Sequence, residues 1–169
     1  MTEAQPARAF ASACAAIGSI DRAAEQSARE HHDRLTKPVG SLGRVEALGI
    51  QLAGIAGSDP PPVPSPAAVA VFAGDHGVVA EGVTPWPQDV TAQMVANFVA
   101  GGAAINVLAR QAGASVTVID VGVATDLDTL GLAGAPGLWR RRVRAGTANL
   151  ATGPALTDAE VRAALDGRR

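Results

Sequence analysis

Asp75 and His76 form the one Asp-His pair of the 169-residue sequence, and they follow a short apolar run directly. That run, Val69–Phe72, is bounded by a proline cluster and by Gly74, which is typical of a strand buried on both faces. Ligands of open α/β sheets bind outside the carboxyl ends of strands. A carboxylate beside an imidazole could there orient a substrate, move a proton or bind a cation. Asp and Gly are equally common in ordinary strand-to-loop turns, so both interpretations stay open.

A second carboxylate ends the next apolar run. Residues 115–121 read S-V-T-V-I-D-V and are followed by Gly122. Helical patterns over 88–100 and 103–111, interrupted at Gly101-Gly102, separate the two runs, which makes a right-handed βαβ unit. We therefore expect Asp75 and Asp120 on neighbouring parallel strands at one edge, with their Cα atoms within about 10–15 Å of each other.

The remaining sheet elements are weaker. Residues 138–143 can form a third strand, whose arginines at 140–142 and 144 favour an edge or surface ribbon. Residues 157–160 (T-D-A-E) are a capping box that opens a helix to Leu165, stopping at Gly167. Glu46, Glu81, Glu160 and these arginines are expected to be solvated charges. A sheet of two or three strands would leave an edge and an apolar face uncovered, so the isolated chain should self-associate.

The amino-terminal part is helical. Residues 21–35 form a polar helix with Asp21 as N-cap, on which the adjacent His31 and His32 diverge and are not a metal pair. Ser41 can cap a second helix, ended by Gly57, with an apolar stripe at Leu42, Val45, Leu48, Leu52 and Ile55. Lys37, Ser41 and Arg44 surround its start and could hold an anion, although a helix–turn–helix with solvated cations is the simpler interpretation.

These elements predict an α/β fold, in which residues 1–57 are a small helical region, 58–66 a proline-rich connector and 67–169 a parallel sheet domain. With 47% hydrophobic and 18% charged residues, the chain is globular. A net charge of −2 and few aromatics argue against nucleic acid. The single Cys14 excludes an internal disulfide and argues against structural zinc, and no uninterrupted apolar run approaches membrane-spanning length. We expect a cytoplasmic protein without cofactor or metal.

Several segments together resemble the nicotinate-nucleotide–dimethylbenzimidazole phosphoribosyltransferases. Val39 departs from the family pattern, which usually has proline there. The matching segments are L-T-K-P-V-G-S-L-G-R-V-E at 35–46, F-A-G-D-H-G-V-V-A-E-G-V at 72–83, P-Q-D-V-T-A-Q-M-V at 87–95, G-G-A-A-I-N-V-L-A-R-Q-A-G-A at 101–114, V-I-D-V-G-V at 118–123 and G-T-A-N-L at 146–150.

The resemblance implies a Rossmann-like parallel sheet, here partial, with a small amino-terminal helical region. It implies transfer of phosphoribose from nicotinate mononucleotide to 5,6-dimethylbenzimidazole, which gives α-ribazole 5′-phosphate and nicotinate for the lower ligand of cobalamin. Trp86 and Met94 match residues that line the base pocket, with Asp75, His76 and Asp120 at the strand ends.

The resemblance covers only the amino-terminal half of the family, whose members are about twice as long. The family's glycine-rich phosphate loop and general-base glutamate lie in the other half, so no catalytic residue is assigned here. The expected partners are the two small-molecule substrates and either a second copy, as a homodimer, or a missing second half. Two alternatives remain: a metal-assisted hydrolase using Asp75, His76 and Asp120, and a non-catalytic remnant that dimerises or binds a partner.

Overall fold

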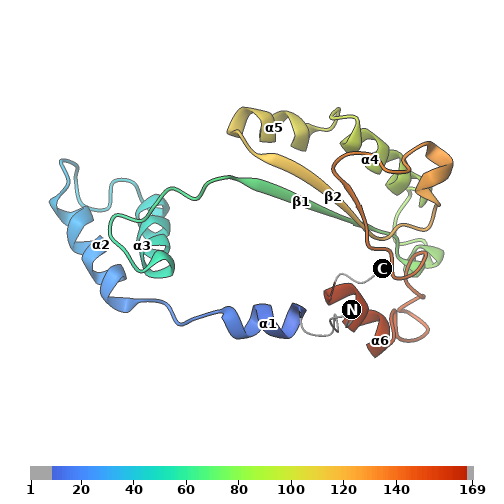
Figure 1. Ribbon diagram of the computed structural model, residues 1–169, viewed down its shortest axis with the longest axis horizontal. Helices are drawn as coiled ribbons and strands as arrows, with labels where there is room; N and C mark the ends of the chain where they lie inside the picture. The colour runs from blue at the N-terminus through green and yellow to red at the C-terminus, as the bar shows by residue number, and fades with distance from the viewer. Residues whose placement is uncertain (1–8, 167–169) are drawn as a thin grey trace, which may run out of the picture. The chain divides into compact units, whose positions relative to one another are not determined.

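The computed structural model describes residues 9–166, so the predicted helix stop at Gly167 lies outside them. Contacts divide the chain into two compact units. Residues 13–65 form a helical unit, and residues from 66 onward form a sheet unit together with the beginning of α1 (Ala9–Ala16). Each unit is drawn in Figure 1.

The helical unit is a pair of helices, α2 (Arg22–Arg34) and α3 (Arg44–Ala56). Asp21 caps α2 as predicted, because its carboxylate accepts hydrogen bonds from the backbone N–H groups of Ala23 and Ala24. Helix α3 ends at Gly57, whose φ of +66° is the left-handed conformation that glycine adopts readily. Small side chains join the two helices in a core of Ala28, Ile50 and Ala53.

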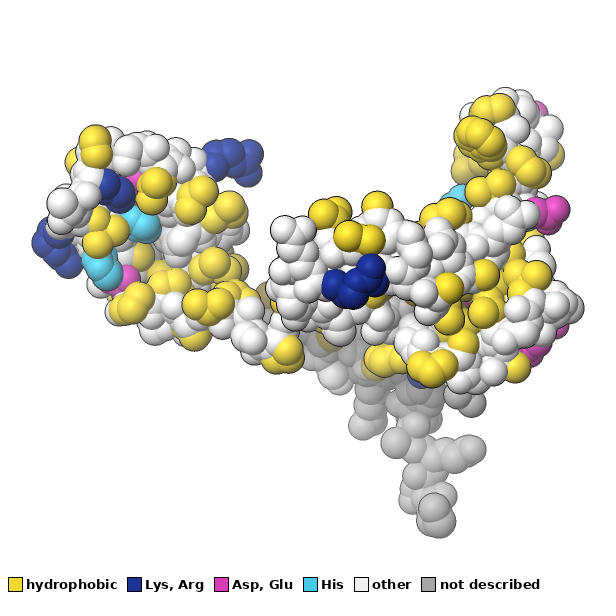
Figure 2. Space-filling view, turned by 90° about the horizontal axis from the view of Figure 1, so that it is seen from above, with side chains coloured by type: hydrophobic (Ala, Val, Ile, Leu, Met, Phe, Trp, Pro, Cys, Tyr) yellow, Lys and Arg dark blue, Asp and Glu magenta, His cyan; other side chains and the backbone are white. Residues whose placement is uncertain are grey.

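The predicted cap of α3 is wrong. The helix begins after Gly43, and Ser41 does not cap it; instead the Glu46 carboxylate accepts a hydrogen bond from the Leu42 N–H at 3.0 Å. The apolar stripe of α3 is exposed, because α2 packs against the opposite side of the helix, through Ile50, Ala53 and Gly54. Hydrophobic side chains are accordingly visible on the surface of this unit in Figure 2. The exposed stripe consists of Leu42, Val45, Leu48, Leu52 and Ile55.

Within the described residues, the sheet unit has three parallel strands in the order β1-β2-β3. They are β1 (Ala68–Gly74), β2 (Ser115–Gly122) and β3 (Leu138–Arg140). Helices α4 (Asp89–Val99) and α5 (Ala104–Ala112) contact this sheet and lie along one side of it (Figure 1). The βαβ unit and the edge position of the third strand are therefore confirmed, although β3 is shorter than predicted.

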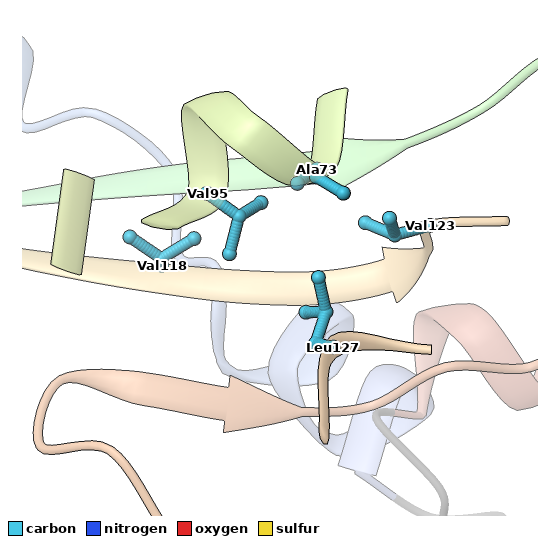
Figure 3. Close-up of a cluster of buried hydrophobic side chains, with 6 residues drawn as sticks. Ala73, Val95, Val118, Val123 and Leu127 are labelled. Carbon is cyan, nitrogen blue, oxygen red and sulfur yellow. The ribbon is translucent and has the colours of Figure 1, made fainter. Parts of the chain in front are cut away.

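The core lies between the sheet and α4. Figure 3 shows Ala73 and Val118 of the sheet facing Val95 of α4, with Val123 and Leu127 closing the cluster beyond the end of β2. All five side chains are almost completely buried. The core is built from alanine, valine and leucine, so it is small, and it ends at the carboxyl edge of the strands.

The prediction that β1 is buried on both faces is wrong. Val69 and Val71 are half-buried, whereas Phe72 is 69% exposed. Because side chains alternate along a strand, Phe72 lies on the face opposite Val71 and Ala73, which pack with α4. The pairing register aligns Phe72 with Ile119 and Trp139, so these three form an apolar row across that open face.

Helices α4 and α5 are separated at the predicted interruption, the glycine pair Gly101-Gly102. Gly101 has a φ of +77°, and a Cβ on Gly102 would collide with the Asn97 Oδ1. By length and composition alone, residues 89–112 are apolar enough to cross a membrane. Ala92, Val95 and Ala109 of this stretch are nevertheless buried within the sheet unit.

Short helical elements complete the sheet unit. Two 3-10 helices, η2 (Gly77–Glu81) and η3 (Leu127–Leu130), follow β1 and β2. Helix α6 (Asp158–Leu165) begins with the predicted capping box, in which the Thr157 hydroxyl accepts from the Glu160 N–H and the Glu160 carboxylate accepts from the Thr157 N–H.

Candidate functional site

Asp75 lies immediately after β1 and is only 5% exposed. Its carboxylate accepts two hydrogen bonds of 2.7 Å, from the Thr91 hydroxyl on α4 and from the Ala124 N–H beyond β2. Ala73 and Asp120 are partners in the pairing of β1 with β2. The prediction that both aspartates lie on neighbouring parallel strands at one edge is therefore confirmed.

Asp120 is fully buried and has the same kind of role. Its Oδ1 accepts hydrogen bonds from the N–H groups of Gly122 and Val123, at 3.1 and 2.9 Å. Its Oδ2 lies 3.5 Å from the Nε of Arg140. The two aspartates together therefore hold the backbone of residues 122–124, which leaves β2 at the edge where ligands of α/β sheets bind.

Arg140 pairs with carboxylates at this edge, whereas we expected it to be a solvated charge. Its guanidinium donates a hydrogen bond to Asp128 and forms longer ion pairs with Asp126 and Asp120. The hydrogen bond to Asp128, reinforced by the other two carboxylates, raises the pKa of Arg140. Arg144 is likewise paired, 3.4 Å from Glu160.

A segment far along the chain crosses over the end of β1. The Thr147 N–H donates to the Asp75 carbonyl at 2.9 Å, and the Gly77 N–H donates to the Thr147 hydroxyl at 3.2 Å. Contact is so close that a Cβ on Gly77 would stand 2.6 Å from the Thr147 carbonyl oxygen and 2.7 Å from the backbone of Asn149. Glycine is therefore required at position 77 for this crossing.

His76, Trp86 and Met94 are the more accessible members of the predicted set. His76 is exposed, and its carbonyl accepts a 3.2 Å hydrogen bond from the Gln88 side chain. Trp86 is 70% exposed on the proline-flanked loop between η2 and α4, and Met94 on α4 is 37% exposed. The structure thus leaves two large apolar side chains outside its own core, one on the loop before α4 and one on α4 itself.

Lys37, Ser41 and Arg44 belong to the helical unit. The Lys37 ammonium is 2.8 Å from the Glu46 carboxylate, and both side chains are largely buried. The hydrogen bond from Lys37, with that from the Leu42 N–H, lowers the pKa of Glu46. The charge of Lys37 is thus already balanced, which favours the structural interpretation, and an anion at this turn remains a prediction.

Four polar side chains at this edge were not predicted as site residues. Thr91 and Thr147 contact Asp75 and Gly77, and Gln88 contacts His76. Asn149 donates to the carboxylate of Glu81 at 2.6 Å, so that Glu81 is not merely a solvated charge. The sequence signal that pointed to these residues was the resemblance of P-Q-D-V-T at 87–91 and G-T-A-N-L at 146–150 to the family. That resemblance identified the two segments but not the contacts that their side chains make.

The donor set needed by the hydrolase alternative is not assembled. Among residues 9–166, no three His, Cys, Asp or Glu side chains stand close enough together to hold a metal ion. Asp75 and Asp120 use their oxygens for backbone N–H groups, a hydroxyl and a guanidinium. The carboxylates of this edge therefore hold the loops that follow the strands.

Known proteins match this chain over most of its length. A family model described as "Phosphoribosyltransferase" matches residues 17–167. This chain is 55% identical, over 161 residues, to the nicotinate-nucleotide–dimethylbenzimidazole phosphoribosyltransferase of Salinispora tropica, and 52% identical, over 151 residues, to that of Pseudomonas fluorescens. The matches cover 90% and 89% of this chain but 44% and 41% of those relatives.

A solved structure agrees with the sequence matches. The crystal structure of the Thermus thermophilus enzyme of the same name has a TM-score of 0.78 and 48% identity, covering 85% of this chain and 42% of that one. The α/β architecture is therefore confirmed. The chain spans less than half the length of the relatives that it matches.

Proposed function

The chain belongs to the nicotinate-nucleotide–dimethylbenzimidazole phosphoribosyltransferase family, and from this premise we propose that it supplies one half of such an active site. In the proposed reaction, a ring nitrogen of 5,6-dimethylbenzimidazole attacks C1′ of nicotinate mononucleotide. The bond from C1′ to the nicotinate nitrogen breaks, and the benzimidazole loses its N–H proton to a base. The products are α-ribazole 5′-phosphate and nicotinate.

The observation that carries the proposal is the hydrogen-bonded carboxyl edge of β1 and β2, in a chain that also leaves Trp86 and Met94 outside its core. An aromatic base needs an apolar slot with few polar groups, which Trp86 and Met94 would provide. The buried carboxylates of Asp75 and Asp120 would position that slot through the loops that they hold. His76, exposed at the same edge, would contact substrate.

The rest of the chemistry needs groups for which this sequence has no matching segment. Charge develops on the ribosyl carbon and must be stabilised, and a proton acceptor must stand near the attacking nitrogen. By the resemblance, the family's glycine-rich phosphate loop and its general-base glutamate have no counterpart in these 169 residues. We therefore propose that a second half, covalent or supplied by another chain, completes the site.

The test is a fusion of residues 1–169 to the part of the Salinispora tropica relative that lies beyond the matched region. Nicotinate release from nicotinate mononucleotide should occur, and it should depend on added dimethylbenzimidazole. Reactions without the base serve as the control. A folded fusion that releases no nicotinate would refute the transferase proposal and would leave the non-catalytic binding role.

A further inference from the structure

The loop that carries Trp86 makes few contacts of its own. This loop, residues 82–87, follows η2 directly and precedes α4, and all of its residues except Thr84 are exposed. Its hydrogen bonds reach only neighbouring residues of the described chain: the Gly82 N–H donates to the Val79 carbonyl at 3.0 Å, and the Trp86 N–H donates to the Thr84 hydroxyl at 3.2 Å. The position of the loop therefore depends on the residues that flank it.

Hydrogen bonds hold both flanks of this loop. On the η2 side, the Asn149 side-chain NH₂ donates to the Glu81 carboxylate at 2.6 Å, across a separation of 68 positions in the sequence. A hydrogen bond to an ionised acceptor is shorter and stronger than a neutral one. On the α4 side, the Gln88 side chain donates to the His76 carbonyl at 3.2 Å. The 82–87 loop thus spans two fixed points.

Asn149 is itself held in a turn that is anchored to the sheet. Its side-chain oxygen accepts from the Ala151 N–H at 3.0 Å, and its carbonyl accepts from the Thr152 N–H at 3.1 Å. Because only the oxygen of the amide can accept, the NH₂ group is left to donate to another residue. Two residues earlier, the Thr147 N–H donates to the Asp75 carbonyl at the end of β1. Asn149 is therefore a preorganised donor.

We propose that Glu81 and Asn149 are positioning residues for the aromatic base, because their hydrogen bond fixes the 82–87 loop, which presents Trp86 to the benzimidazole ring. The inference rests on the proposed function, in which Trp86 lines the base slot. A loop that is loosely held has to be ordered when the base binds, and that ordering reduces affinity. The pair acts through the loop, so its loss should weaken base binding and leave the chemical step unchanged.

The first test measures the mobility of Trp86 in the full 169-residue chain. Trp139→Phe leaves Trp86 as the sole tryptophan, since the sequence contains two. In this background Asn149→Asp puts a carboxylate where the NH₂ group meets Glu81, and at about pH 8 both carboxylates are ionised and repel each other. The fluorescence anisotropy of Trp86 should then decay faster than in the chain with Asn149. An unchanged decay would overturn the proposal.

The exchanged pair is the matched control. In Glu81→Gln/Asn149→Asp each replacement has the shape of the residue it replaces, and the total charge of the pair is unchanged. The glutamine NH₂ can donate to the introduced carboxylate, which can still accept from the Ala151 N–H. This double variant should restore the slow decay, and a decay as fast as that of Asn149→Asp alone would overturn the proposal. Urea unfolding, followed by the same fluorescence, checks that each variant is folded.

The second test measures nicotinate release by the fusion described above. Asn149→Asp should raise the KM for dimethylbenzimidazole about tenfold, which corresponds to one hydrogen bond to a charged group. It should leave kcat and the KM for nicotinate mononucleotide within about twofold, because only binding of the base is weakened. The exchanged pair should restore the KM for the base. A loss confined to kcat would overturn the proposal.

The two tests separate this inference from the proposed function. A faster decay in Asn149→Asp, reversed in the exchanged pair, without any nicotinate release by the fusion would support the hold on the loop and refute the transferase. Nicotinate release with the same KM for the base in Asn149→Asp and in the unmodified fusion would refute the positioning role and support the transferase.

Discussion

Asp75→Asn distinguishes an orienting carboxylate from a catalytic base. The Asp75 side chain is 5% exposed and accepts two hydrogen bonds of 2.7 Å, from the Thr91 hydroxyl and from the Ala124 N–H. An asparagine can keep both, because its oxygen can accept from Ala124 while its NH₂ donates to the hydroxyl, which can also accept. Only the charge assistance is lost. Asp75→Ala instead leaves a buried N–H without a partner.

The expected free energies follow from these contacts. A hydrogen bond to a charged group contributes about 1.5–3 kcal/mol and a neutral one about 1, so weakening both bonds in Asp75→Asn should lower the free energy of unfolding by about 1–4 kcal/mol. Asp75→Ala should lower it by about 3–6 kcal/mol, since both bonds are lost and one donor stays buried. Both tryptophans lie in the sheet unit, so urea unfolding followed by their fluorescence reports on this unit alone.

The fusion enzyme supplies the decisive comparison. An orienting role predicts nicotinate release by Asp75→Asn within about threefold of the unmodified fusion, whereas loss of a general base costs about 10²–10⁴-fold. A stable Asp75→Asn enzyme with a loss of that size would make Asp75 the proton acceptor. Equal destabilisation by Asn and Ala would refute the hydrogen-bond assignment.

Three other predictions follow from single contacts. Gly77→Ala should destabilise the sheet unit by about 1–3 kcal/mol in urea unfolding, because the added Cβ would stand 2.6 Å from the backbone of the segment that crosses β1. Gly74→Ala, whose Cβ would have its nearest atom at 3.6 Å, should be neutral or stabilising, and a larger loss of stability in Gly74→Ala than in Gly77→Ala would contradict this close contact. In the fusion, dimethylbenzimidazole should alter tryptophan fluorescence; Trp86→Ala should abolish the change and Trp139→Phe should keep it, and a surviving signal in Trp86→Ala would exclude that residue from the pocket. Hydrogen bonds from the backbone N–H and the hydroxyl of the α6 N-cap residue lower the pKa of Glu160, so this carboxylate contributes fully to stability above its unfolded pKa of 4.5 and loses that contribution as the pH falls through the lower folded pKa. Glu160→Gln should therefore reduce the fall in the free energy of unfolding at acid pH, and an unchanged fall would contradict this role of Glu160.

Local signals predicted the elements of the sheet unit well. The apolar runs before Asp75 and Asp120, the glycine pair at 101–102 and the capping box at 157–160 each act within a few residues, and each appears in the structure at the expected place. The placement of the two aspartates also followed, because parallel strands joined by a helical crossover end at the same edge.

Burial was predicted less well, because it depends on what covers a face. The pattern at Val69–Phe72 is that of a strand with two covered faces, yet α4 and α5 contact this sheet from one side and Phe72 stays exposed. The α3 stripe likewise has correct helical spacing, but α2 packs against Ala53 on the other side.

The contacts at the strand ends were beyond sequence reasoning. Thr147 lies far along the chain from Asp75, and nothing in the spacing of G-T-A-N-L shows that its backbone crosses β1 there. The Lys37–Glu46 pair was missed for the same reason, since a turn of unknown geometry separates the two residues.

Nicotinate release by the purified 169-residue chain, with its mass confirmed and with dimethylbenzimidazole present, tests the central claim most directly. The account predicts no release by the chain alone and release once the remaining part of the Salinispora tropica relative is added, with a rate that saturates as that part is titrated. Robust turnover by the chain alone would contradict the account. The proton acceptor and the phosphate site would then both have to lie within these 169 residues, where we assign neither.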